Sequence, residues 1–411
     1  MKKIPVALAI LCAILLQGCF KDTLTRTYTI LRPVYKSKAE VYANIKNNTP
    51  QQIQTPGKLF VHGTYVFLNE VNKGVHIIDN SDPHHPIDKA FINIPGNLDI
   101  AVKGTVLYAD MYGDLLTIDI ADPMHVKLLD HLSNVFPDRI YEGGFVADTT
   151  QIIVDWIKKD TTVAAGPAGN NNIYVPSPLT LQNSDGAVDK VIGISGSMAR
   201  FVIVNDYMYA VNSHTLQCLS LADPAQPTVA SLLDAGWDIE TIYPFQNKLF
   251  LGSMGGMFIF DISQPADPVA DGNFVHARAC DPVIADDSYA YITLREGTSC
   301  GPANNELQIV NVKDIHSPIF IKSYPMTSPQ GLSKDNNELF VCDGKDGLKI
   351  YDVSNASNII LKKHIKGLEP YDVIAWNNNL FVVAKDGLYQ YDYSNPYDLI
   401  LESKLSINSE N

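Results

Sequence analysis

Charged residues recur at one register of the sequence, about twenty residues before each copy of a short repeated motif. In chain order the residues at this register are Asp99, Arg139, Arg200, Glu240, Asp281, Gly331 and Asp372. Asp238 lies close to Glu240, and Arg295 begins an insertion described below. Arginines gathered in this way could hold a carboxylate or phosphate, and the acids could bind a cation or sugar hydroxyls, or act as general acid and base.

The repeated motif is a hydrophobic strand that ends in an aspartate and a proline-bracketed turn, as in G-M-F-I-F-D-I-S-Q-P-A-D-P from Gly256 to Pro268. Its aspartate position is occupied in order by Asp79, Asp119, Ser220, Asp261, Asn311, Asp352 and Asp392. Most steps are 40 or 41 residues, one is 50 and one is 101. We interpret the longest step as one further repeat, with Gln182 at the aspartate position, plus an insertion. This interpretation gives eight repeats.

Each repeat divides into four short runs rich in β-branched and aromatic residues, separated by turns rich in Gly, Asn, Asp and Pro. Around Asp261 the predicted strands are Thr241 to Phe245, Lys248 to Ser253, Met257 to Ile262 and Val269 to Val275. Four antiparallel strands in some forty residues are typical of a propeller blade. The sequence therefore predicts an all-β fold, a single β-propeller of about eight four-stranded blades over residues 57–407, with seven as the alternative count.

The repeats resemble the LVIVD repeat family of exported bacterial and archaeal proteins, whose strand is of the L-x-I-x-D-I-S-x-P type. The best matches to it are Leu115 to Pro123, Met257 to Pro265 and Leu348 to Asn355. The resemblance implies a fold and an exported location. It implies no activity.

The N-terminus has the pattern of a signal peptide. Lys2 and Lys3 precede an apolar run from Ile4 to Leu16, which is too short to span a bilayer. The run ends in L-Q-G-C, which resembles the lipobox of bacterial lipoproteins and implies cleavage before Cys19 and lipidation of its thiol. We expect residues 1–18 to be removed and residues 19–56 to form a solvated tether with a strand (Thr27 to Val34) and a short helix (Ser37 to Lys46). Residues 408–411 are a C-terminal tail.

The chain is acidic, with a formal net charge of -14 that becomes -16 once the two lysines of the signal peptide are removed. This charge argues against nucleic acid and anionic membrane surfaces as partners. No cysteine pair or His/Cys cluster has zinc-ligand spacing, so we expect no metal and no cofactor. We also expect a monomer, tethered only through Cys19 and exported to the cell envelope, with the outer membrane favoured over the inner.

In a propeller the first strand of each blade lines the central axis, so the charged register should converge on one mouth of the channel. One interpretation is a polar binding pocket formed by the residues named above. The other is that these charges pair with one another and with open backbone groups at the strand ends. Both interpretations are kept open here.

Two insertions fall in connections between second and third strands, on the same face as the channel mouth. They run from Lys158 to Ser177 and from Arg295 to Asn305. Cys280 and Cys300 flank the two strands that lead into the second insertion, so we predict a disulfide between them. Cys218 and Cys342 fall within strands of different blades and are predicted to be buried thiols.

We therefore predict a binding or interaction module at the envelope, recognising an envelope protein or glycan with the face that carries the insertions. One alternative is an enzyme at the channel mouth, with Asp281, Glu240 or Asp238 as acid or base and an arginine to stabilise charge. Another is a scaffold in envelope assembly, by analogy with the propeller lipoprotein of the outer-membrane barrel-insertion machinery. The sequence gives more weight to binding than to catalysis.

Overall fold

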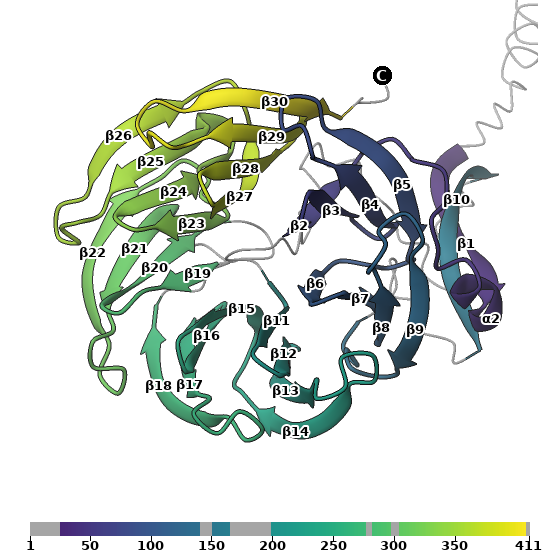
Figure 1. Ribbon diagram of the computed structural model, residues 1–411, viewed down its shortest axis with the longest axis horizontal. Helices are drawn as coiled ribbons and strands as arrows, with labels where there is room; N and C mark the ends of the chain where they lie inside the picture. The colour runs from purple at the N-terminus through teal and green to yellow at the C-terminus, as the bar shows by residue number, and fades with distance from the viewer. Residues whose placement is uncertain (1–24, 140–149, 165–198, 277–281, 297–303, 408–411) are drawn as a thin grey trace, which may run out of the picture. The chain divides into compact units, whose positions relative to one another are not determined.

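The computed structural model describes residues 25–139, 150–164, 199–276, 282–296 and 304–407. Within these residues the chain forms seven four-stranded antiparallel sheets and one two-stranded sheet. The seven sheets are the blades of a propeller (Figure 1). The prediction of a propeller is confirmed, and the alternative count of seven blades replaces the count of eight.

Each blade is one continuous segment whose four strands pair in chain order. Blades 1 to 3 contain β2 (Pro56–His62), β3 (Tyr65–Glu70), β4 (Gly74–Asp79) and β5 (Ile87–Asn93); β6 (Ile100–Lys103), β7 (Val106–Met111), β8 (Asp114–Asp119) and β9 (Lys127–Leu132); and β11 (Phe201–Val204), β12 (Tyr207–Val211), β13 (Thr215–Ser220) and β14 (Thr228–Asp234). Blades 4 and 5 contain β15 (Ile239–Phe245), β16 (Lys248–Ser253), β17 (Gly256–Asp261) and β18 (Val269–Val275); and β19 (Val283–Ala285), β20 (Tyr289–Leu294), β21 (Glu306–Asn311) and β22 (Ile319–Pro325). Blades 6 and 7 contain β23 (Leu332–Asp335), β24 (Glu338–Cys342), the 3-10 turn η2 (Gly344–Asp346), β25 (Leu348–Asp352) and β26 (Ile360–Ile365); and β27 (Pro370–Trp376), β28 (Asn379–Ala384), β29 (Gly387–Asp392) and β30 (Ile400–Ser406).

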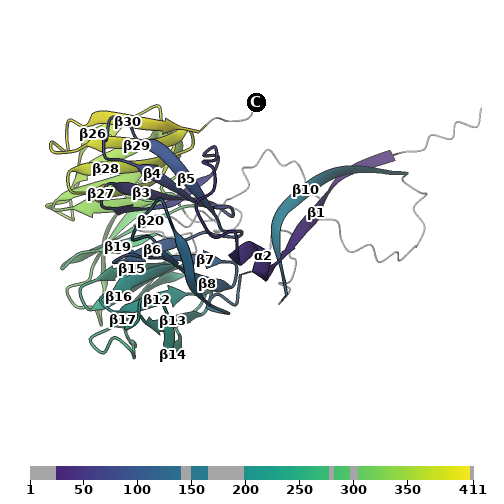
Figure 2. The same ribbon diagram turned by 45° about the vertical axis from the view of Figure 1, so that its right-hand side comes forward.

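The prediction of an eighth repeat was wrong, because part of the segment assigned to it forms a different structure. Residues Gln151–Ala164 form strand β10, which pairs with β1 (Thr25–Ser37) in a two-stranded sheet (Figure 2). The first part of the predicted insertion, Lys158 to Ala164, is therefore strand and not a loop between strands of a blade. The rest of that insertion and Gln182 lie outside the described residues. A repeat length predicts how many strands fit into a segment, but not which strand each one pairs with.

The repeated aspartate ends the third strand of every blade by the same hydrogen bond. Its side-chain oxygen accepts from the backbone N–H two residues later, for example Ser263 N to Asp261 Oδ1 at 2.7 Å and Ala121 N to Asp119 Oδ1 at 2.9 Å. The residues at the aspartate position of the other five blades, including Ser220 and Asn311, accept the same hydrogen bond. This Asx-type turn explains why Asp, Asn and Ser are interchangeable at the position.

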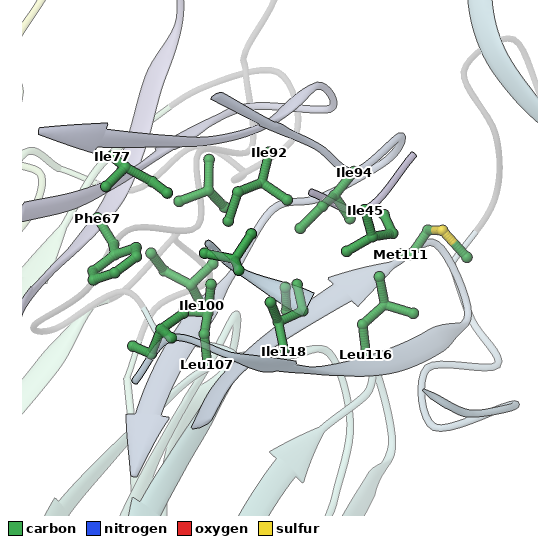
Figure 3. Close-up of a cluster of buried hydrophobic side chains, with 14 of the residues drawn as sticks. Ile45, Phe67, Ile77, Ile92, Ile94, Ile100, Leu107, Met111, Leu116 and Ile118 are labelled. Atoms are coloured by element: carbon green, nitrogen blue, oxygen red, sulfur yellow. The ribbon is translucent and has the colours of Figure 1, made fainter. Parts of the chain in front are cut away.

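Apolar side chains from neighbouring blades form the core between them. Figure 3 shows the cluster between blades 1 and 2, where Phe67 and Ile77 meet Leu107 and Ile118. Ile45, from the segment before blade 1, packs into the same cluster.

The segment before blade 1 is packed on the propeller from Tyr35 onward, although we expected a solvated tether. Its helix α2 (Lys38–Tyr42) begins with a capping box between Ser37 and Glu40. Val41 and Ile45 are buried in the core of blades 1 and 2, and Asn48 forms a β-bridge with Phe91 on the outer strand of blade 1. The bridge satisfies part of a strand edge that would otherwise be open.

The ring closes between blades 7 and 1 by apolar contacts. Leu68 and Ile78 of blade 1 pack against Phe381 and Leu388 of blade 7. Among the residues that the structure describes, no hydrogen bond or ion pair joins these two blades, whereas other seams carry them. Tyr209 of blade 3, for example, donates its hydroxyl to Pro265 O of blade 4 at 2.8 Å.

The seam between blades 7 and 1 has Phe381 at the position that Tyr209 and Tyr108 hold in their blades, and a small pocket opens beside it. We predict that Phe381→Tyr supplies the missing hydroxyl to the proline turn of blade 1 and stabilises the protein by about 0.5–1.5 kcal/mol. Urea unfolding measures the change. The converse control, Tyr209→Phe, should lose a similar amount, and a destabilised Phe381→Tyr protein would mean that the seam has no room for the hydroxyl.

Candidate site at the channel mouth

The inner strands of the seven blades begin at equivalent positions, fixed by the pairing of each first strand with its second. Counted from the turn between the two strands, every blade has an equivalent pair near the start of its first strand, which in blade 2 is Ile100 with Ala109. The first-strand residues that immediately precede this pair form a ring at the mouth of the channel. This inner-strand ring consists of Lys58, Asp99, Arg200, Thr241, Pro282, Gly331 and Asp372.

The structure places Asp99, Arg200 and Asp372 of the predicted set on this ring. Glu240 precedes Thr241 of the ring at a β-bulge in β15, and Arg139 lies on the segment that follows β9 instead of on an inner strand. Asp281 lies outside the described residues. Lys58 belongs to the ring and was missed, because the offset of about twenty residues was not applied to the first repeat, whose aspartate is Asp79.

Charges alternate along one arc of the ring, from Asp372 of blade 7 through Lys58 and Asp99 to Arg200 of blade 3. Lys58 and Asp99 form an ion pair in which both side chains are at most 5% exposed. The second carboxylate oxygen of Asp99 accepts from Arg200 N at 2.7 Å and Phe201 N at 3.1 Å. Asp99 thus ties blades 1, 2 and 3 together at the axis.

A second buried acid, Asp110 at the end of β7, holds the segment that leads into β6. One of its oxygens accepts from Leu98 N at 2.7 Å and Asp99 N at 2.8 Å, and the other lies 3.5 Å from Arg139 Nη1. Burial raises the pKa of Asp110, and the nearby Arg139 opposes that rise. Arg139 also donates to Gly96 O at 2.8 Å.

The same use of acids appears in two other blades. Glu70, at the end of β3, accepts from the backbone N–H of Thr55 at 2.6 Å, and Asp343, after β24, accepts from Thr327 N at 2.9 Å and Ser328 N at 2.8 Å. In each case the acid satisfies the segment that enters its blade's inner strand. These contacts fit the interpretation in which mouth charges satisfy open backbone groups.

Arg200 is surrounded by other charged residues of the channel mouth. Burial and the charge of Arg139 lower its pKa, while the carboxylates of Asp110, Asp99 and Glu240 raise it. The structure therefore brings Arg200, Arg139, Asp99 and Glu240 into one electrostatic group. An arginine held in this way is oriented by fixed negative charges around it.

Asp372 differs from the other acids because neither of its carboxylate oxygens has a hydrogen-bond partner, and it is fully buried. Burial raises the pKa of Asp372 well above its usual range. The N–H of Val373 and the charge of Lys58 oppose this rise, although the Val373 N–H does not reach hydrogen-bond geometry. A side chain at Gly331 would lie 2.1 Å from Asp372 Oδ1, so only glycine fits beside it. A fully buried carboxyl group does not contact a ligand in the channel.

Two further predicted residues lie in connections on the mouth face. Asp238 has φ 53° in the turn before β15 and accepts from Met254 N at 3.1 Å through its carbonyl oxygen. Arg295 begins the connection between β20 and β21.

That connection, residues 295–305, is longer than the link between second and third strands in every other blade, and its residues 297–303 lie outside the described residues. The other six blades use two to five residues there. Its base is fixed, because Glu296 N donates to Asn305 Oδ1 at 3.0 Å and Asn305 Nδ2 donates to Glu296 Oε1 at 3.2 Å. Cys280 and Cys300 lie outside the described residues, so their disulfide stays a prediction.

The remaining cysteines behave as predicted. Cys218 and Cys342 are free and buried. Burial raises the pKa of the Cys218 thiol to about 11 and that of Cys342 well above its usual value, which makes both unreactive at neutral pH.

Among the residues that the structure describes, no group of three or more His, Cys, Asp or Glu side chains is arranged to hold a metal ion. Nor does any helix in that part of the chain reach the length and hydrophobicity needed to cross a membrane.

A family model described as the LVIVD repeat matches residues 57–92, 97–131 and 336–366. The chain carries LVIVD repeats. The matches fall on blades 1, 2 and 6 of the propeller, and they include the motifs at Leu115 to Pro123 and Leu348 to Asn355. The motif at Met257, in blade 4, lies outside the matched residues.

Solved structures share the architecture of the LVIVD propeller. BamB from Moraxella catarrhalis superposes with a TM-score of 0.50 at 10% identity, over 81% of this chain and 83% of BamB. The computationally designed protein Ika8 gives 0.52 at 9% identity, over 86% and 88%. PorZ, described as an essential surface component of the type-IX secretion system of Porphyromonas gingivalis, gives 0.50 at 16% identity, over 87% of this chain and 39% of PorZ. Such low identities show the fold alone, and no curated protein matches the chain in sequence.

Proposed function

We propose that this LVIVD propeller is an interaction module of the cell envelope, exported and lipid-anchored through Cys19. Its binding face is the channel mouth, with the connection at residues 295–305 and the side chains of Arg200, Asp238, Glu240 and Arg295. The partner is an envelope protein or a glycan. Support for the location comes from the N-terminal sequence, and from the likeness in fold to PorZ, which is described as a surface component of a secretion system.

The observation that carries the proposal is the selective lengthening of one connection on a rigid base. Buried acids such as Asp99 and Asp110 hold the inner strands of blades 1 to 3, and the Glu296–Asn305 pair closes the base of the 295–305 connection. Long connections on a rigid scaffold are where proteins place recognition residues.

The test is a pull-down from solubilised envelopes with wild type and a variant in which residues 297–303 are replaced by a two-residue Gly-Ser link. We expect the variant to lose at least one partner that the wild type recovers, because the connection would no longer reach it. Since Cys300 is removed with the segment, the matched control is the full-length double variant Cys280→Ser, Cys300→Ser. If the shortened variant recovers the same partners as this control, the 295–305 connection is not a recognition element.

A further inference from the structure

Trp237 is the most exposed large hydrophobic side chain in the described part of the chain, at 75% of its surface. It lies between the outer strand of blade 3 and the inner strand of blade 4, which places it on the channel-mouth face. Its ring meets that of His214 edge-on, with centroids 4.8 Å apart and planes at 68°. His214 supports the indole while most of the indole stays open to solvent.

The turn that carries Trp237 is fixed on both sides. Gly236 has φ 117° and Asp238 has φ 53°, two left-handed conformations that turn the chain sharply around the tryptophan. A side chain at Gly236 would lie 2.8 Å from the Phe258 ring, so the turn fits closely against blade 4. Ala235 N donates to His214 O at 2.8 Å, and Ile239 N donates to Ser213 O at 3.0 Å. The indole is therefore presented by a rigid turn.

Two exposed carboxylates are hydrogen-bonded to the backbone one residue before each of the two aromatic residues. Asp234 Oδ1 accepts from Gly236 N at 3.1 Å, one residue before Trp237, and Asp138 Oδ2 accepts from Ser213 N at 3.1 Å, one residue before His214. Neither carboxylate forms an ion pair with another residue that the structure describes. The chain as a whole carries a net charge of -14.

We propose that Trp237, with Asp138 and Asp234, binds an arginine side chain of a protein partner. A guanidinium group carries only hydrogen-bond donors and an ionised carboxylate only acceptors, so the two are complementary. A planar guanidinium also stacks on an indole face, and Trp and Arg are the residues that most often dominate interface energies. A neutral sugar could also stack on the indole and donate its hydroxyls to the carboxylates, but it would gain nothing from their negative charge. This inference rests on the proposed function and names the partner chemistry of the same face.

The direct test uses an acetylated and amidated arginine dipeptide as the probe, with the citrulline dipeptide as its neutral isostere. Labelling the indole nitrogens gives one NMR signal for each of the three tryptophans. We expect the Trp237 signal to shift with arginine and saturate, and citrulline to bind about tenfold more weakly, the ratio that corresponds to a cation–π energy of about 1.4 kcal/mol. Raising the salt concentration should weaken binding of arginine, since the carboxylates are exposed.

The variants assign the effect to residues. In the wild type the arginine probe should also shift the backbone amide signals of Ser213 and Gly236 until they saturate. Trp237→Ala should abolish this saturable shift. Asp138→Asn with Asp234→Asn should weaken it severalfold and reduce its salt dependence. Trp376→Ala is the matched control, because Trp376 is 45% exposed at the end of β27, on the opposite face. Because Trp237 is exposed, unchanged thermal unfolding of Trp237→Ala will show that the fold is intact.

Equal binding of citrulline and arginine, or arginine binding that survives Trp237→Ala, overturns the inference. Saturable binding of a neutral oligosaccharide that needs Trp237 but not the carboxylates would assign the platform to a sugar instead. The envelope pull-down separates this inference from the proposed function. If Trp237→Ala keeps partners that the shortened 295–305 variant loses, the module binds partners but not through Trp237. If wild type recovers neither an envelope protein nor a glycan, the proposed function fails while the probe titration still decides the inference.

Discussion

Replacing Asp99 by alanine is expected to destabilise the propeller by about 3–5 kcal/mol, the usual result of removing one partner of a buried ion pair. The variant leaves the Lys58 ammonium buried without its counter-charge. It also removes the acceptor of Arg200 N and Phe201 N, so two backbone groups of blade 3 lose a partner at the axis. Urea unfolding followed by circular dichroism measures the loss.

A matched exposed pair provides the control. Asp206 is 73% exposed and pairs with Lys103, so Asp206→Ala should change stability by no more than about 1 kcal/mol. The double variant Lys58→Met, Asp99→Ala should be more stable than Asp99→Ala, because it removes the stranded charge as well. An Asp99→Ala protein as stable as Asp206→Ala would mean that Asp99 does not hold the blades together and is free to serve a ligand.

Asp372→Asn is expected to stabilise the protein at neutral pH by at least about 1 kcal/mol, because it removes a buried acid whose raised pKa makes the folded state less stable as pH rises, and one pKa unit corresponds to about 1.4 kcal/mol. The side chain is fully buried and neither carboxylate oxygen has a hydrogen-bond partner. Asparagine keeps the shape next to Gly331 but carries no charge. The gain should be measured by urea unfolding at several pH values.

The pH dependence of this gain has a definite sign. Burial raises the folded-state pKa of Asp372 above its value in the unfolded chain, so the folded state keeps its proton to higher pH. Wild-type stability therefore falls as pH rises from the ordinary aspartate pKa, about 4, through the raised value. Since asparagine does not titrate, the advantage of Asp372→Asn should be smallest near pH 4 and grow over that window. A constant difference across this range would show that Asp372 is ionised in the folded protein throughout.

The fold could be predicted because its signal is repeated and local. The Asx turn at Asp261 and its equivalents needs only one side chain and the next two residues, so it leaves a pattern that can be recognised in any single repeat. In blade 4 the predicted strands match β15 to β18 to within two residues at each end.

What could not be predicted depends on contacts between distant segments. Residues 151–164 have the composition of a strand, but their partner β1 lies more than a hundred residues earlier, so repeat spacing assigned them to a blade. The same limit applies at the channel mouth. The sequence placed Asp99 there correctly. Its hydrogen bonds with Arg200 N and Phe201 N could not be predicted, because they depend on how blade 3 packs beside blade 2. Trp237 gave no signal because a single tryptophan in a turn matches no motif.

The continuity of each blade has a consequence for biogenesis. A blade whose four strands are consecutive can pair internally as soon as its segment has been synthesised, so most contacts form early and at short range. The flank of blade 1 that carries Val66, Leu68 and Ile78 is the exception, since its cover comes from Phe381, Val383 and Leu388 near the end of the chain. During synthesis this apolar surface stays uncovered until the last blade has been made. It is therefore where a holding chaperone, or a second unfinished chain, would bind first.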